Sequence, residues 1–154
     1  MVIIYMCYGS AHSSVVAASI HIGLLPTDRV PSFREIISLP HYDKTSNEEI
    51  GTLFYMGKDE FGNEVYIVGA RNGRDIVTKA IYSFLNLYGI SEKEVLVVDA
   101  LPAIGITTKI GGIASRRLGI ISLGRPITVY GILKRYKNFV ELVTAIKTKL
   151  QKIS

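Results

Sequence analysis

The sequence lacks a second cysteine and has no tryptophan. With Cys7 as its single cysteine, the chain can form no internal disulfide, which excludes the small disulfide-stapled proteins and fits a reducing cytoplasm. Charged residues are also scarce, at 20% against 48% hydrophobic residues, and this balance excludes a disordered chain. A length of 154 residues is sufficient for a complete core, so we expect one α/β domain over residues 1–154.

Acidic residues are nearly absent from the last third of the chain. Residues 1–99 hold 8 Lys+Arg and 12 Asp+Glu, a net of −4, whereas residues 100–154 hold 10 Lys+Arg and one acid, Glu141, a net of +9. The formal net charge of +5 therefore conceals a basic C-terminal third. Such a segment indicates either an anionic partner or an ordinary solvated face.

No charged side chain occurs between residues 2 and 25. A hydropathy window would mark this stretch as a membrane span, but a span would place the polar residues of the 9–14 segment at mid-bilayer, where they are costly. A signal peptide would need positive charge before the apolar run, and the side chains of residues 1–8 carry none. We therefore expect no membrane association and a cytoplasmic location.

The charge-free stretch has the pattern of a strand, a polar turn and a helix. Val2–Cys7 is a continuous apolar run typical of parallel sheets, and Ser13–Gly23 has helical spacing and ends at a glycine. A helix N-terminus offers free backbone N–H groups and a positive dipole end, where α/β proteins bind anions. We therefore predict a phosphate or other anion site at this turn. Its predicted ligands are Gly9, Ser10, His12, Ser13 and Ser14.

Further elements follow from periodicity and turn signals. Strand-like runs at 52–57 and 64–69 flank Gly62-Asn63 and predict a hairpin, and two capping-box patterns predict short helices after Ser32 and Ser46. The remaining expectations are helices at 75–87, 106–118 and 136–153, a doubly buried strand at 95–99 and a last strand at 126–131.

Because strands alternate with helices, we predict a three-layer α/β sandwich with a mostly parallel sheet, P-loop-like or Rossmann-like. In such folds ligands bind at the C-terminal ends of the strands.

The turn and the 95–99 strand together resemble an incomplete P-loop and Walker B pair, the two motifs with which many proteins bind nucleotides. A P-loop ends in Gly-Lys-Ser/Thr, and here Ala11, His12 and Ser13 occupy those positions. Asp99 ends its strand as the acid of a Walker B strand does. The lysine and the second glycine are missing, and a neutral histidine cannot match the permanent charge of a lysine. Anion binding is therefore favoured over nucleotide hydrolysis.

Three other features could take part in chemistry. Cys7 ends a strand before a turn and a helix, as a phosphatase or arsenate-reductase nucleophile does, but Ser13 stands where such enzymes carry an arginine, and a buried structural thiol is the alternative. His12 is the best candidate for acid–base work, whereas His21, inside the helix, is expected to be structural. The candidate phosphate clamps, or ordinary surface charges, are Arg116, Arg117 and Arg125. No His, Cys and Asp set has metal-ligand spacing.

Four segments of the chain, 7–18, 100–103, 112–119 and 124–126, have a familiar pattern. The first reads Cys-Tyr-Gly-Ser-Ala-His-Ser-Ser-Val-Val-Ala-Ala, and the third reads Gly-Ile-Ala-Ser-Arg-Arg-Leu-Gly. With them the chain resembles domain of unknown function family 3189, small proteins of spore-forming and anaerobic bacteria. The resemblance implies a single-domain bacterial cytoplasmic protein and no particular activity.

Two classes of function remain open. One is an enzyme acting on a phosphorylated small molecule or a nucleotide, with His12, Cys7 and Asp99 as candidate catalytic residues. The other is a non-enzymatic module that binds an anionic partner or nucleic acid through the basic C-terminal third, although no zinc-finger, helix-turn-helix or RNA-binding signature supports nucleic acid. A structural partner in a larger assembly would leave no trace in the sequence.

Overall fold

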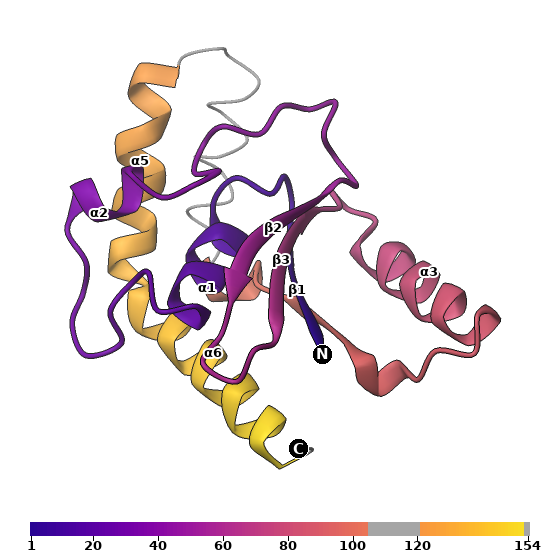
Figure 1. Ribbon diagram of the computed structural model, residues 1–154. Helices are drawn as coiled ribbons and strands as arrows, with labels where there is room; N and C mark the ends of the chain where they lie inside the picture. Colours follow the sequence, from indigo (N-terminus) through magenta and orange to yellow (C-terminus); the bar gives the residue numbers. More distant parts are fainter. Residues whose placement is uncertain (105–120, 153–154) are drawn as a thin grey trace.

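The computed structural model describes residues 1–104 and 121–152, and its centre is a sheet with the strand order β2-β3-β1-β4 (Figure 1). β1 (Val2–Cys7) runs parallel to β3 (Glu64–Gly69) and to β4 (Val95–Asp99), whereas β2 (Leu53–Lys58) is antiparallel to β3. The predicted α/β class, the hairpin and the mostly parallel sheet are confirmed. β4 is an edge strand and is only half-buried, so the prediction of a doubly buried strand was wrong there.

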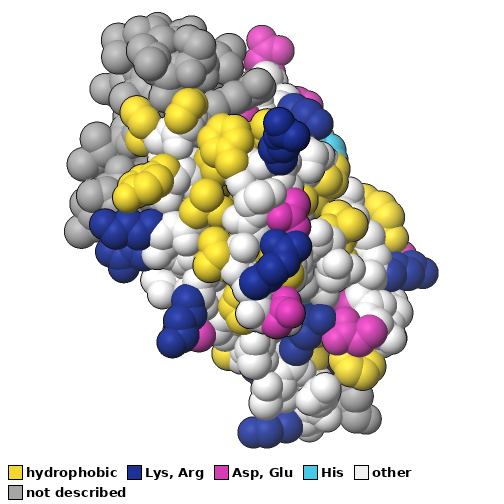
Figure 2. Space-filling view, turned by 90° about the vertical axis from the view of Figure 1, so that its left-hand side faces the viewer, with side chains coloured by type: hydrophobic (Ala, Val, Ile, Leu, Met, Phe, Trp, Pro, Cys, Tyr) yellow, Lys and Arg dark blue, Asp and Glu magenta, His cyan; other side chains and the backbone are white. Residues whose placement is uncertain are grey.

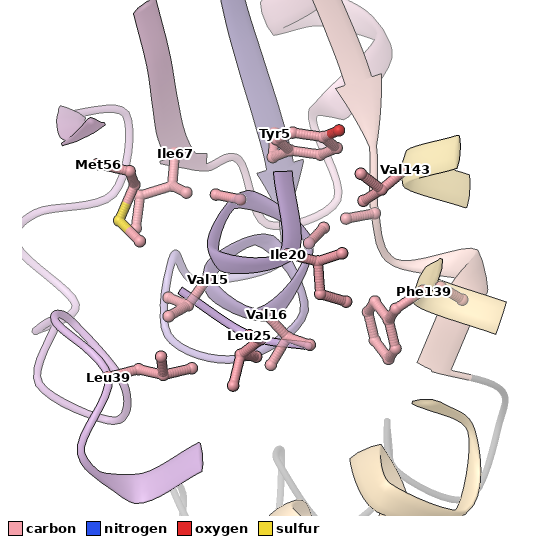
Figure 3. Close-up of a cluster of buried hydrophobic side chains, with 14 of the residues drawn as sticks. Tyr5, Val15, Val16, Ile20, Leu25, Leu39, Met56, Ile67, Phe139 and Val143 are labelled. Carbon is pink, nitrogen blue, oxygen red and sulfur yellow. The ribbon is translucent and has the colours of Figure 1, made fainter. Parts of the chain in front are cut away.

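Helices lie against both faces of the sheet. On one face, α1 (Ser13–His21) and α6 (Tyr136–Gln151) form the main core with the strands, together with α5 (Ile121–Lys134) and α2 (Phe33–Ile37) (Figures 1 and 3). On the other face, α3 (Arg74–Leu87) packs onto a smaller apolar cluster. Two short 3-10 helices, η1 (Glu92–Glu94) and η2 (Pro102–Ile104), flank β4.

Burial explains most of the charge-free stretch, because residues 2–21 are buried or half-buried. Every residue of α1 is buried, because the helix packs against the sheet on one side and against α6 on another (Figure 3). Tyr5, Ile20 and Phe139 meet in this core. A charged side chain would lose its hydration there without a partner. Within the described residues, no helix is both long and apolar enough to cross a bilayer.

Two of the predicted secondary-structure elements were wrong: the strand at 126–131 and the short helix after Ser46. Residues 126–131 belong to α5 rather than to a strand, even though Pro126 lies inside that helix. The β-branched run gave the wrong prediction because burial outweighs local propensity: Val129 and Ile132, three residues apart, both reach the core.

The second capping-box pattern, at 46–49, forms turns and no helix. The Ser46 amide donates to the Glu49 carboxylate, but Gly51 in a left-handed conformation ends the segment before a helical turn can be completed. At α2, by contrast, both bonds of the box between Ser32 and Glu35 are present, as predicted. The helix expected at 106–118 lies outside the described residues.

A buried chain of polar groups fixes the end of α1 to the β2–β3 hairpin. The Tyr5 hydroxyl lies 2.7 Å from Nδ1 of His21, and Nε2 of His21 lies 3.2 Å from Oδ2 of Asp59. A neutral imidazole with its proton on Nε2 satisfies both contacts, because the tyrosine then donates to Nδ1 and the imidazole donates to the carboxylate. His21 is therefore a structural residue, as predicted from its place in the helix.

Burial lowers the pKa of His21, and the hydrogen bond to Asp59 offsets this effect only in part. Desolvation raises the pKa of Asp59, but hydrogen bonds from Asn63, His21 and Phe61 outweigh it and hold that pKa below its usual range. The other charges facing His21 are Lys147 and Glu60, which pair with each other at 2.7 Å.

We expect the protein to lose stability as the pH falls from about 7 to about 5, because the unfolded imidazole takes up a proton near 6.5 while the folded one resists it. The stabilisation is complete above the unfolded pKa and is lost as the pH falls through the folded pKa of His21. Thermal melts at stepped pH would measure the slope, and His21→Gln should flatten it. A melting temperature that is constant or rises on acidification would contradict this account.

Candidate functional site

The β1–α1 turn touches the loop after β3 at backbone level. The amides of Ala70 and Arg71 donate to the carbonyls of Cys7 and Tyr8, at 3.0 and 2.8 Å. A Cβ on Gly69 would lie 2.8 Å from the Gly9 carbonyl carbon and 2.8 Å from Oγ of Ser10, so only glycine permits this approach. The two loops therefore form one tightly packed unit at the C-terminal edge of the sheet.

A third loop, residues 41–45, covers the turn. The Asp43 amide donates to the Ala11 carbonyl at 3.0 Å, and the Thr45 hydroxyl donates to the Gly9 carbonyl at 2.8 Å. The His12 ring meets the Tyr42 ring edge-on at a centroid distance of 5.3 Å. This packing holds the imidazole of His12 beside the N-terminus of α1.

His12 is paired with a carboxylate that sequence reasoning missed. Its Nε2 lies 3.5 Å from Oδ1 of Asp43, close enough for ion pairing but without hydrogen-bond geometry. Asp43 lies in the irregular segment between Pro40 and the hairpin, where no periodicity or motif indicates that it folds back over residues 9–12. Thr45 was missed for the same reason.

Backbone strain is concentrated at this edge of the sheet. Among the described residues, the non-glycine residues with positive φ are Ser10 (52°), His41 (61°), Asp43 (55°) and Arg71 (47°), and all four lie in these three loops. Such conformations cost on the order of 1–3 kcal/mol each and persist where the surrounding structure imposes them, often at functional sites.

Two buried polar atoms at the turn have no hydrogen-bond partner within the described residues. They are Oγ of Ser10 and Nε2 of His12; a third such atom, Oγ of Ser19, lies farther along α1. Ser10 is 1% exposed, and an unsatisfied buried donor costs about 1–3 kcal/mol. The N-terminus of α1 has no side-chain cap and no acid in its first turn. This short segment therefore combines two buried side-chain atoms that lack a hydrogen-bond partner among the described residues with an uncapped helix N-terminus.

The predicted catalytic residues lie on opposite faces of the sheet. Cys7 points toward α1, with its Sγ 3.1 Å from Oγ of Ser14. Asp99 pairs in register with Met6, whose side chain packs toward α3, and its carboxylate accepts from Nε of Arg74 at 2.9 Å. Alternation along a strand sends neighbouring side chains to opposite faces, so Cys7 and Asp99 do not meet.

The structure thus brings together Gly9, Ser10 and His12, with Ser13 and Ser14 buried in the first turn of α1. Arg116 and Arg117 lie outside the described residues, and Arg125 belongs to α5, where its side chain is not described. In the described part of the chain, no three or more His, Cys, Asp and Glu side chains gather as metal ligands would.

These features define a mixed α/β protein with a strained strand–turn–helix at the C-terminal edge of a mostly parallel sheet. Over residues 2–148 the sequence matches the family described as protein of unknown function (DUF3189), and the chain belongs to that family. The resemblance drawn from the sequence is thereby confirmed. No curated protein and no solved structure matches the chain. The match spans the turn, its covering loop and β4, and it supplies no activity.

Proposed function

We propose that the β1–α1 turn binds an oxyanion, a phosphate group above all, and that the protein is an enzyme acting on a phosphorylated small molecule or a nucleotide. The observation that supports this most directly is the buried hydroxyl of Ser10, which has no hydrogen-bond partner among the described residues and lies beside an uncapped helix N-terminus. An anion there would accept the Ser10 hydroxyl and the first backbone N–H groups of α1 together.

The connectivity of the sheet supports an anion site at the same end of β1. β1 leads into α1 on one face and β3 leads into α3 on the other, so the chain diverges between these two adjacent strands. In open α/β sheets the ligand crevice lies at such a switch point. We propose on this basis a three-layer, Rossmann-like arrangement with its anion site at the C-terminal ends of β1 and β3, next to Ser10, rather than between β1 and β4.

His12 is the proposed acid–base group. Its imidazole lies at the turn, and the carboxylate of Asp43 orients it from 3.5 Å away. Cys7 is buried and hydrogen-bonded to Ser14. Asp99 accepts a hydrogen bond from Arg74 on the opposite face of the sheet. Both residues are therefore weaker candidates for a catalytic role than His12. The negative charge of Asp43 opposes an anion at this place, so the hydrogen-bond donors of the turn and the positive end of the α1 dipole must outweigh it.

Replacing Ser10 with alanine should weaken phosphate binding roughly ten- to a hundredfold, because a hydrogen bond to a charged group contributes about 1.5–3 kcal/mol. Isothermal titration calorimetry with inorganic phosphate measures the change. Ser19→Ala is the matched control: it removes another buried hydroxyl that has no partner among the described residues, from the middle of α1 and away from the turn. Equal phosphate affinity in the two variants would refute the role of Ser10.

The alternative is a module that binds an anionic partner through the basic C-terminal third. On the face shown in Figure 2, however, Lys and Arg side chains are interspersed with Asp and Glu. Lys147 and Lys137 each pair with an acid, Glu60 and Glu141 respectively. A salt titration with generic nucleic acid distinguishes the two functions, because a steep loss of affinity supports the module.

A further inference from the structure

α3 carries large apolar side chains on the side turned away from the sheet. Val77 and Ile81 pack onto the apolar cluster beneath the helix, but no residue of α3 is fully buried. Ile76, Phe84 and Leu87 are 74%, 62% and 75% exposed. Apolar side chains scattered singly on a surface are common, whereas a contiguous group of this size marks an interaction surface.

These side chains form one stripe along the helix. Ile76, Ala80, Phe84 and Leu87 follow each other at helical spacing, which places them on one side of α3. Tyr88, just past the end of the helix, is also exposed. Ala80 lies in the middle of the stripe, where a small side chain lets a second helix axis come close. The inner positions of the stripe are one small residue, Ala80, and one large residue, Phe84, so an antiparallel second copy can place its Phe84 against Ala80.

The charges at the two ends of α3 favour the same partner. Exposed Arg71 precedes the helix, and exposed Glu92 and Glu94 follow it. At the N-terminal end of α3, Asp75 offsets only one of the two basic side chains, Arg71 and Lys79. At the C-terminal end, Lys93 offsets only one of the two acids. The first end therefore stays basic and the second stays acidic. In an antiparallel pair the basic end of one helix lies beside the acidic end of the other.

The neighbouring sheet edge is a poorer place for a second copy. The Ala100 amide bonds to the Met6 carbonyl, so the odd-numbered residues of β4 direct their backbone groups to the open edge. The Tyr82 hydroxyl, from α3, lies 3.5 Å from the Val95 carbonyl oxygen and 3.4 Å from the Val97 amide. This side chain covers the edge, as protected edge strands require.

We propose that two copies of this chain associate through the exposed stripe of α3, with the two helices antiparallel about a two-fold axis. Such a contact is isologous: the same patch serves both copies, and Ile76 of one faces Leu87 of the other, with Ala80 of one beside Phe84 of the other. Arg71 of each copy then lies near Glu92 of its partner. The contact lies on the α3 face of the sheet, away from the α1 face.

Sedimentation of the full-length protein tests this proposal. The wild type should be a dimer at about 10 µM, and Phe84→Glu should raise the dimer dissociation constant at least about tenfold, because it places a charge in the stripe. Tyr130→Glu is the matched control, since Tyr130 is an equally exposed aromatic residue, 69%, on α5. Circular dichroism establishes that each variant is folded. A monomeric wild type, or a dimer lost in Tyr130→Glu and kept in Phe84→Glu, would overturn the proposal.

Charge reversal tests the orientation of the two helices. Arg71→Glu should weaken the dimer, and adding Glu92→Arg to the same chain should restore it, because each reversed charge then faces its opposite in the partner. Additive weakening in the double variant would exclude the antiparallel arrangement.

Discussion

Replacing Asp59 with alanine is expected to lower the free energy of unfolding by about 3–5 kcal/mol, because a buried donor left without an acceptor costs about 1–3 kcal/mol and the other hydrogen bonds lost from the carboxylate add to this cost. The carboxylate accepts from Nε2 of His21 at 3.2 Å, from the amides of Phe61 and Asn63 at 2.9 and 2.8 Å, and from the Asn63 side chain at 2.9 Å. Its loss leaves a fully buried imidazole without an acceptor and removes the bonds that close the β2–β3 turn.

Urea unfolding followed by circular dichroism measures this loss. Asp28→Ala is the matched control, because Asp28 is exposed and its replacement should change stability by less than about 0.5 kcal/mol. A double-mutant cycle with His21→Phe should show that the two residues are strongly coupled. If Asp59→Ala unfolds at the same urea concentration as Asp28→Ala, the Tyr5–His21–Asp59 chain does not hold α1 to the hairpin.

The Gly69→Ala substitution should lower stability by about 1–3 kcal/mol and also weaken phosphate binding. The added Cβ would lie 2.8 Å from the Gly9 carbonyl carbon and 2.9 Å from its Cα, and backbone atoms cannot rotate away as a side chain can. The β1–α1 turn must therefore shift, and Oγ of Ser10, also 2.8 Å from that Cβ, would shift with it.

Gly73→Ala provides the control for this prediction. It lies in the loop that follows Gly69, at a φ of −90°, and its added Cβ would meet no atom closer than 3.4 Å. Calorimetry and thermal melts on both variants give the two readouts. Equal stability and equal phosphate affinity in the two variants would show that the tight approach at Gly69 is unimportant.

Much of this fold can be predicted from the sequence, because the decisive signals are local. The continuous apolar run of β1, the hairpin turn at Gly62 and the capping box at Ser32 each specify their element within a few residues. α5 could not be predicted in this way. Its Ile-Thr-Val-Tyr run favours a strand, and it is helical because Val129 and Ile132 reach the core, a tertiary effect.

The candidate site, like the fold, has a part that local sequence predicts and a part that depends on tertiary contacts. The turn at Gly9–Ser14 was predicted from local chemistry, whereas the loop that carries Asp43 returns to it from beyond α1 and α2, through irregular chain. The face to which Asp99 points depends on its register with Met6, which the sequence of a single strand does not contain. Sequence reasoning therefore predicted the strand, turn and helix of this segment and misjudged which acidic residue lies beside it.

A crystal structure determined from crystals grown in phosphate is the most direct test of the proposed anion site. The account predicts tetrahedral density within hydrogen-bond distance of Oγ of Ser10 and of the first backbone amides of α1, with the imidazole of His12 beside it. Clear density for the turn with no phosphate there, or with phosphate only among surface lysines, would contradict it.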